Sequence, residues 1–138
     1  MVVLADQVTK SLVLGHLHGS SHVLGPLSIE VGTNDGAAFS SLQSRGWGLT
    51  VASVAIIAVV GVVMVRQRKP QMVVALALVV GGAIGNLIDR ALRPGHGVVD
   101  FLTLPHFATF NLADVAITAG AGLAGWCLVV NPRGQRDG

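Results

Sequence analysis

Three long apolar runs dominate the second half of the chain. They cover residues 47–65, 71–88 and 110–130, and the third run includes Asp114. A membrane-spanning helix needs about 20 mostly apolar residues, because each residue advances a helix by only about 1.5 Å. The pattern therefore predicts three transmembrane helices over these ranges, and it places a carboxylate inside the third one.

The segment before residue 47 has a different periodicity. Residues 27–31, Leu-Ser-Ile-Glu-Val, alternate between apolar and polar side chains, which is typical of a half-buried strand. The residues Asn34-Asp35-Gly36 follow this alternation and favour a turn. We therefore expect residues 20–44 to form a small β-rich element outside the membrane.

The N-terminal segment is apolar but short. Residues 1–15 are interrupted by Asp6 and Lys10, and the apolar pattern is too brief to cross a bilayer. The segment also lacks the basic start and the cleavage site of a secretory signal peptide. We interpret it as a truncated first helix, so that residues 1–138 form a single membrane-embedded domain.

Composition and charge placement refine this topology. The chain is 51% hydrophobic and 12% charged, whereas soluble domains carry about 25% charged residues. Basic residues gather at 66–69, between the first two runs, and at 133–136, after the third. The positive-inside rule makes both segments cytoplasmic, which places the β element and the link between the second and third helices outside. No basic, aromatic-rich face exists, and this excludes nucleic-acid binding.

Acidic residues cluster at the predicted outer ends of the helices. These residues are Asp89, Asp100 and Asp114, and burying an ionisable group in a bilayer costs at least about 2.5 kcal/mol unless it is paired or hydrated. The trio Asn86, Asp89 and Arg90 shares one helix face, and Asn111 with Asp114 repeats the same spacing on the next helix. Two polar faces can therefore meet at one depth, with Asp100 in the intervening loop.

Paired carboxylates in a poorly solvated site cannot both ionise easily, so one holds a proton while the other is charged. This is the requirement of aspartic proteolysis, in which one carboxylate activates water and the other polarises the carbonyl. On residue types alone, a plainer interpretation stays open. In that interpretation Asp89 and Arg90 form an ion pair at a helix end, and Asp114 only caps a helix.

Metal chemistry has little support in the sequence. His16 and His18 have a spacing that can bind metal, but no carboxylate or cysteine ligands accompany them. Cys127 is the single cysteine and lies in an apolar run, so no disulfide framework or cysteine cluster is available. We therefore expect neither a metal nor another cofactor.

Five ordered motifs resemble those of lipoprotein signal peptidase, also called signal peptidase II. They are Asp6-Gln-Val-Thr-Lys10, Asn34-Asp-Gly-Ala-Ala-Phe39, Gly81-Gly-Ala-Ile-Gly-Asn-Leu-Ile-Asp-Arg90, Gly97-Val-Val-Asp-Phe101 and Phe110-Asn-Leu-Ala-Asp114. The resemblance implies an all-α bundle of four transmembrane helices, although family members begin with a full first helix and Asp6 here stands close to Met1.

The resemblance also implies an activity and a set of site residues. The activity is cleavage of bacterial prolipoproteins before a diacylglyceryl-modified cysteine, by a multi-pass protein of the cytoplasmic membrane whose active site faces outward. Its implied partners are these substrates and membrane lipids, and we expect a monomer. The implied catalytic residues are Asp100 and Asp114. The implied substrate-binding or supporting residues are Asn86, Asp89, Arg90, Asn111, Asn34, Asp6 and Lys10.

Two alternatives belong to another class, that of non-catalytic membrane proteins. A subunit of a proton-coupled transporter would use buried carboxylates as a proton relay, and these would be distributed through the depth of the bilayer. An inactive binder of lipidated peptides would keep the groove without the chemistry. The clustering of carboxylates at one face favours the peptidase over the transporter.

Overall fold

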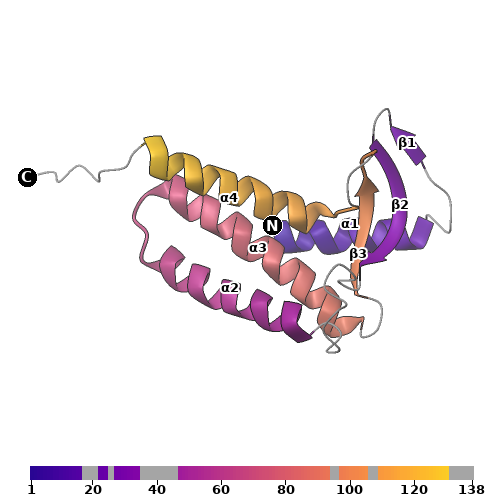
Figure 1. Cartoon of the computed structure of the whole chain (residues 1–138), viewed down its shortest axis with the longest axis horizontal. Coiled ribbons are helices and arrows are strands. Elements are labelled where there is room, and N and C mark those ends of the chain that lie inside the picture. The colour runs from indigo at the N-terminus through magenta and orange to yellow at the C-terminus, as the bar shows by residue number, and fades with distance from the viewer. Residues whose placement is uncertain (17–21, 25–26, 35–46, 94–96, 106–108, 131–138) are drawn as a thin grey trace, which may run out of the picture.

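In the part of the chain that the structure describes, four helices form a bundle, and a three-stranded sheet lies at one end of it (Figure 1). The computed structural model describes residues 1–16, 22–24, 27–34, 47–93, 97–105 and 109–130. The helices are α1 Val2–His16, α2 Trp47–Val65, α3 Pro70–Leu92 and α4 Leu112–Val130, and the strands are β1 His22–Leu24, β2 Leu27–Asn34 and β3 Val98–Thr103. The expected fold class, a helical membrane bundle with a small β element, is confirmed.

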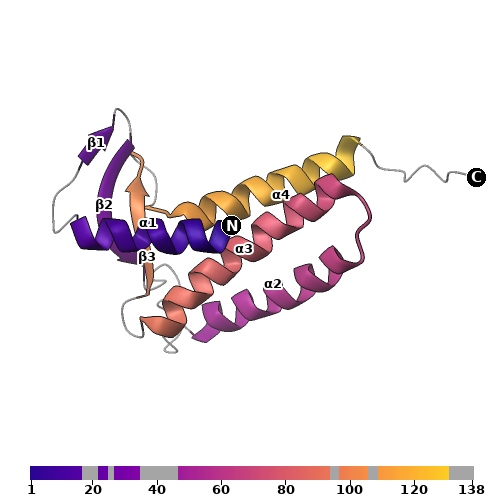
Figure 2. The ribbon, with the colours of Figure 1, turned by 180° about the vertical axis from the view of Figure 1, so that it is seen from behind.

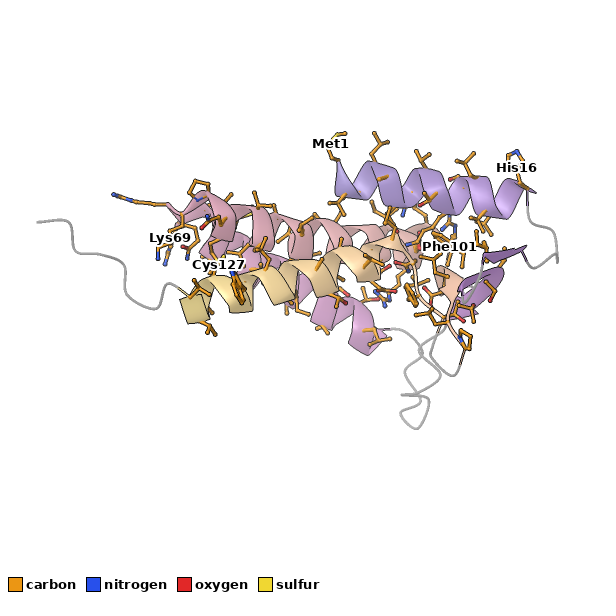
Figure 3. All side chains as sticks on the ribbon, turned by 90° about the horizontal axis from the view of Figure 1, so that it is seen from above. Met1, His16, Lys69, Phe101 and Cys127 are labelled. Carbon is orange, nitrogen blue, oxygen red and sulfur yellow. The ribbon has the colours of Figure 1, made fainter. Side chains whose placement is uncertain are left out.

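Among the helices of the described ranges, three are long and apolar enough to cross a membrane. Their candidate spans are Gly48–Val65, Pro70–Leu92 and Leu112–Val130, with mean hydropathies of 2.6, 2.0 and 1.7. Helix α3 lies between α2 and α4, as the two opposite views show (Figures 1 and 2). Helix α1 packs on α3 and α4 and runs from the middle of the bundle, at Met1, to the sheet end, at His16 (Figure 3).

Small residues allow α3 and α4 to approach closely. A Cβ atom on Gly120 would stand 2.6 Å from the carbonyl oxygen of Ala75, and one on Gly82 would collide with the carbonyl of Ala113. Between membrane helices there is no hydrophobic driving force, so van der Waals contact over small residues supplies much of the attraction. Glycine at these positions therefore sets the separation of the two helices that carry Asn86 and Asp114.

The sheet is antiparallel, with strand order β1-β2-β3. Its register pairs Gly32 with Asp100 and Asn34 with Val98, and an irregularity separates this part from the pairing of Ile29 with Leu102. The sheet therefore extends from the N-terminal β element to the segment between α3 and α4. Gly97, with a φ of 65°, adopts the left-handed conformation just before β3 and directs the chain into the strand.

The expectation that Asp100 lies in a loop was wrong, because Val98–Thr103 is strand β3. Val98, Val99, Asp100 and Phe101 are all buried, on both faces of the strand. A strand buried on both faces shows a continuous apolar run instead of alternation, so period-two analysis overlooks it.

The observed helix ends differ slightly from the sequence-based ranges. Helix α3 continues to Leu92 instead of ending at residue 88, and α4 begins at Leu112 instead of residue 110. Phe110 instead forms an isolated bridge with Leu102. Of the β element expected over residues 20–44, residues 20–21, 25–26 and 35–44 lie outside the described part of the chain, and so does the predicted turn at Asp35-Gly36.

Candidate active site

Buried polar side chains gather where α1, α3, β3 and the start of α4 meet. The buried members are Asp6, Lys10, Asn86, Asp89, Asp100 and Asn111. Asp114 and Arg90 are half-buried beside them. Asn34 ends β2, where the sheet register pairs it with Val98. Each buried polar side-chain atom in the described ranges has a hydrogen-bond partner, as burial in a membrane protein requires.

Asn111 connects the two candidate catalytic carboxylates. Its side-chain Nδ2 donates to Oδ1 of Asp100 at 2.7 Å, and its backbone N–H donates to Oδ2 of Asp114 at 3.2 Å. In return, the backbone N–H of Asp114 donates to Oδ1 of Asn111 at 3.0 Å. This reciprocal pair is a capping box at the N-terminus of α4. The sequence-based alternative that Asp114 caps a helix therefore describes a real contact, but only one of its oxygens takes part.

Asn86 bonds the other oxygen of Asp114. Its Nδ2 donates to Oδ1 of Asp114 at 2.8 Å, while its Oδ1 accepts from Nδ2 of Asn111 at 3.1 Å and from Nζ of Lys10 at 3.3 Å. A lysine ammonium can only donate, so the oxygen of the Asn86 amide must face Lys10. The amide nitrogen must then face Asp114, and the orientation of Asn86 is settled by charge.

An ion-pair cluster lies next to this site. Lys10 Nζ stands 2.7 Å from Oδ2 of Asp89 and 2.8 Å from Oδ2 of Asp6, and both side chains of each pair are fully buried. Arg93 Nη1 stands 2.7 Å from Oδ1 of Asp89. Two carboxylates and two cations cancel in formal charge, which lowers the cost of burying them. In the described part of the chain, Asp89 thus pairs with Lys10 and Arg93, contrary to the alternative that paired it with Arg90.

The same carboxylates hold backbone segments that lead to the candidate dyad. Oδ1 of Asp6 accepts the N–H of Ala113 at 3.0 Å, in the first turn of α4 beside Asp114. Oδ2 of Asp89 accepts the N–H of Val99 at 3.2 Å, the residue before Asp100. Each member of the dyad is therefore attached, one residue away, to an aspartate of the ion-pair cluster.

Arg90 connects α3 to α2. Its Nη1 donates to Oγ of Ser53 at 3.3 Å. Its guanidinium also interacts electrostatically with Asp114, Asp89 and Asp100. Arg90 thus places a positive charge near the dyad, and the ion-pair partners of Asp89 are Lys10 and Arg93 instead.

Three further residues of the site, Gln7, Arg93 and Ser53, were not among those predicted from the sequence. Gln7 Nε2 donates to Oδ1 of Asp89 at 3.1 Å and to the carbonyl of Gly85 at 3.2 Å. Arg93 follows Asp89 by one helical turn, so its spacing was a usable signal. Ser53 lies within an apolar run, where nothing in the sequence distinguishes it from a packing residue.

No group of three or more histidine, cysteine, aspartate or glutamate side chains in the described ranges is arranged to hold a metal ion. The side chains that meet at this site are carboxylates, amides and cationic groups. Two neighbouring carboxylates positioned by amides can exchange protons with water and with a carbonyl group.

The comparisons with known proteins agree with the motifs and the fold. The family model described as "Signal peptidase (SPase) II" matches residues 1–130. The chain is similar to the lipoprotein signal peptidase of Brevibacillus brevis, at 39% identity over 89% of this chain and 86% of that protein. It is also similar to that of Paraburkholderia phymatum, at 42% identity over 99% and 87%.

A solved structure shares the fold as well. It is described as a bacterial membrane enzyme, and it superposes with a TM-score of 0.85 at 31% identity, covering 94% of this chain and 88% of that one. The sequence-based family resemblance is thereby confirmed. The chain belongs to the signal peptidase II family and is an integral membrane protease.

Proposed function

We propose that this chain removes signal peptides from bacterial prolipoproteins as an aspartic endopeptidase, cleaving before the diacylglyceryl-modified cysteine. The substrate class is supported by relatives named lipoprotein signal peptidase. The aspartic chemistry is supported by one observation above all, the bridge that Asn111 makes between Asp100 and Asp114. The bridge holds two carboxylates of a membrane protease at one point of the fold.

The proposed reaction uses the dyad with a single proton. The ionised carboxylate accepts a proton from water as the water oxygen attacks the carbonyl carbon of the scissile peptide bond. The protonated carboxylic acid donates its hydrogen bond to the carbonyl oxygen and stabilises the charge that develops there. When the tetrahedral intermediate collapses, the C–N bond breaks and the departing amine takes a proton from the dyad. The site ends with one proton, as it began.

The neighbouring residues act as positioning groups in this proposal. Lys10 orients the amide of Asn86, and Asn86 and Asn111 together donate to both oxygens of Asp114. Asp6 and Asp89 attach the backbone beside each dyad member. Catalytic groups must be held within a fraction of an ångström, because small misplacements cost large factors in rate.

The location of the site suits a substrate that is itself a membrane segment. The basic link 66–69 joins α2 and α3 at the end opposite the sheet (Figure 1), so the positive-inside rule favours an extracytoplasmic dyad and a cytoplasmic-membrane location. Asp100 is 3% exposed and Asp114 is half-buried, so water and peptide reach the pair through Asp114. The β element, with Asn34 and Phe39, would hold the substrate over the dyad, although Phe39 lies outside the described residues.

The decisive experiment is cleavage of a purified, diacylglyceryl-modified prolipoprotein in lipid. Asp100→Asn and Asp114→Asn should each lower kcat by about 10³-fold or more, since each removes an acid–base group. Asp137→Asn, a matched change in the C-terminal tail, should leave the rate unchanged. Retained cleavage in either dyad variant would overturn the assignment, and binding without cleavage by the parent chain would identify an inactive lipopeptide binder.

Topology and the β element need separate measurements. In a Cys127→Ser background, an impermeant maleimide should label Val31→Cys in intact spheroplasts and Arg66→Cys only after lysis. The reverse labelling would invert the proposed orientation.

Phe39→Ala should slow cleavage of the lipidated substrate if the β element holds that substrate, and normal cleavage would remove that role. Size measurement in lipid nanodiscs tests whether the active species is the proposed monomer.

A further inference from the structure

A cavity opens between α3 and α4 at the end of the bundle opposite the carboxylates. Its volume is about 320 Å³, and its lining includes Lys69 and Gln71 beside the start of α3, and Leu123, Trp126 and Val130 on the last turns of α4. Figure 3 labels Lys69 and Cys127 close together at this end. The cavity is distant from the site described above, and the proposed peptidase chemistry makes no use of it.

The lining has two chemical halves. Lys69 and Gln71 supply an ammonium and an amide, whereas α4 supplies aliphatic and aromatic surface. The volume lies at the lower end of the range of about 300–1,000 Å³ that is typical of ligand sites. It also exceeds by far the share of about 30 Å³ that one water molecule occupies. A ligand matching this lining has an anionic or polar end joined to an apolar end.

The depth of the cavity in the membrane restricts the chemical class of its ligand further. Helix α3 begins at Pro70 and α4 ends at Val130, so the cavity lies where apolar spans give way to a basic link. The exposed Arg66 and Arg68 add positive charge to the same link. At this level acyl chains meet lipid headgroups, and basic residues here attract anionic lipids. Charge, lining and depth agree on one class of molecule.

We propose that this cavity binds one anionic phospholipid, with the phosphate end at Lys69 and Gln71 and the first part of an acyl chain along Leu123, Trp126 and Val130. The proposed site distinguishes two neighbouring cations, because Lys69 lines the cavity and Arg68, one residue earlier, does not. Uniform attraction of lipids to a basic surface would not distinguish these two cations.

The sequence provides a reporter for this site. Trp126 lines the cavity, and Trp47 is the only other tryptophan, so a Trp47→Phe protein contains a single fluorophore at the proposed site. This protein is reconstituted in phosphatidylcholine vesicles. Brominated phosphatidylglycerol or brominated phosphatidylcholine is then added at equal mole fraction, and quenching of Trp126 measures each lipid's association.

The expected result is that phosphatidylglycerol associates about fivefold more strongly than phosphatidylcholine, a ratio that corresponds to about 1 kcal/mol. Lys69→Gln should reduce the ratio to about one, while the matched Arg68→Gln should largely preserve it. Cys127→Phe, which fills the cavity without changing charge, should also abolish the preference. It keeps the test valid if Lys69→Gln disturbs folding, which circular dichroism would reveal.

Several outcomes would overturn the proposal. Equal quenching by both lipids in the Trp47→Phe protein removes the specificity, and equal loss in Lys69→Gln and Arg68→Gln reduces it to general surface charge. Relief of quenching by millimolar inorganic phosphate would identify a free-phosphate site in place of a lipid site. A preference that appears only after deletion of residues 131–138 would assign the cavity to the C-terminal tail.

Discussion

The sheet end of the bundle and the rest of its length differ in the contacts that stabilise them. At the sheet end, fully buried charges such as Lys10 and Asp89 are paired and hydrogen-bonded at distances of 2.7–3.3 Å. Along the remaining length, α2 presents apolar side chains outward, and none of its candidate span Gly48–Val65 is buried inside the protein. The sheet end depends on directional polar contacts, and the rest of the bundle depends on contact with lipid and on close helix packing.

This difference explains where the protein can be specific. A lipid-facing helix tolerates many side chains of suitable size, because the lipid adapts to the surface. A buried polar network admits few arrangements, since each unpaired group carries a large desolvation cost. The positions of Asp100 and Asp114 are therefore determined at the polar end, and the helices mainly provide the depth and orientation at which the polar end operates.

Lys10→Met should have the largest effect on this comparison. It leaves Asp6 and Asp89 buried without their shared cation, so the free energy of unfolding in mixed micelles should fall by about 3–5 kcal/mol. The control Arg66→Gln removes one exposed positive charge from the basic link between α2 and α3, at the end opposite the sheet, and should change stability little. Adding Asp6→Asn to Lys10→Met should restore part of the loss. Equal effects of Lys10→Met and Arg66→Gln would contradict the role of the cluster.

Substitutions at Asn111 separate helix capping from bridging of the dyad. Asn111→Ala should lose about 1 kcal/mol of stability with the cap and about 100-fold in kcat with the bridge. Asn111→Ser retains a good cap residue but removes the Nδ2 atom that donates to Asp100. Stability should therefore stay near that of the parent protein, while kcat falls. If Asn111→Ser kept full activity in the prolipoprotein assay, the bridge would be dispensable.

Gly85→Ala tests how closely α1 and α3 must approach. The added Cβ would stand 2.7 Å from Oδ2 of Asp6, the oxygen that bonds Lys10. Overpacking of this kind costs about 1–3 kcal/mol, and cleavage should weaken along with stability. Gly61→Ala is the matched control on α2, because nothing lies within 4 Å of its added Cβ. A Gly85→Ala protein as stable as Gly61→Ala would show that the polar end can adjust.

The smallest effect is expected on the outward surface of α2. Val59 is 63% exposed in the isolated protein, so its side chain faces lipid in a membrane. Val59→Leu should change the free energy of unfolding by no more than about 0.5 kcal/mol and leave kcat unchanged. A larger loss, measured in the same mixed micelles, would indicate a protein contact on this face.

The sequence predicts part of the candidate site well. The helical spacing of Asn86 and Asp89, and the repeat in Asn111 and Asp114, indicated polar faces on adjacent helices, and Asn86 does bond Asp114. It did not reveal that Lys10 would orient Asn86, because these residues are 76 positions apart. Local periodicity carries no information about such a contact. The catalytic and supporting roles of these residues stay predictions until the substitutions are measured.

The sequence alone showed that this protein resides in a membrane. The length of an apolar run and the placement of charges beside it are local properties, and they act on the bilayer without any tertiary contact. The ordered motifs of the sequence also identified the family. The three-dimensional structure was needed to show that residues 98–103 are a strand paired with β2, that Asp89 pairs with Lys10 and Arg93, and that Asn111 joins the two carboxylates. These features depend on the packing of distant segments, where burial makes each polar group seek a partner that chain order does not specify.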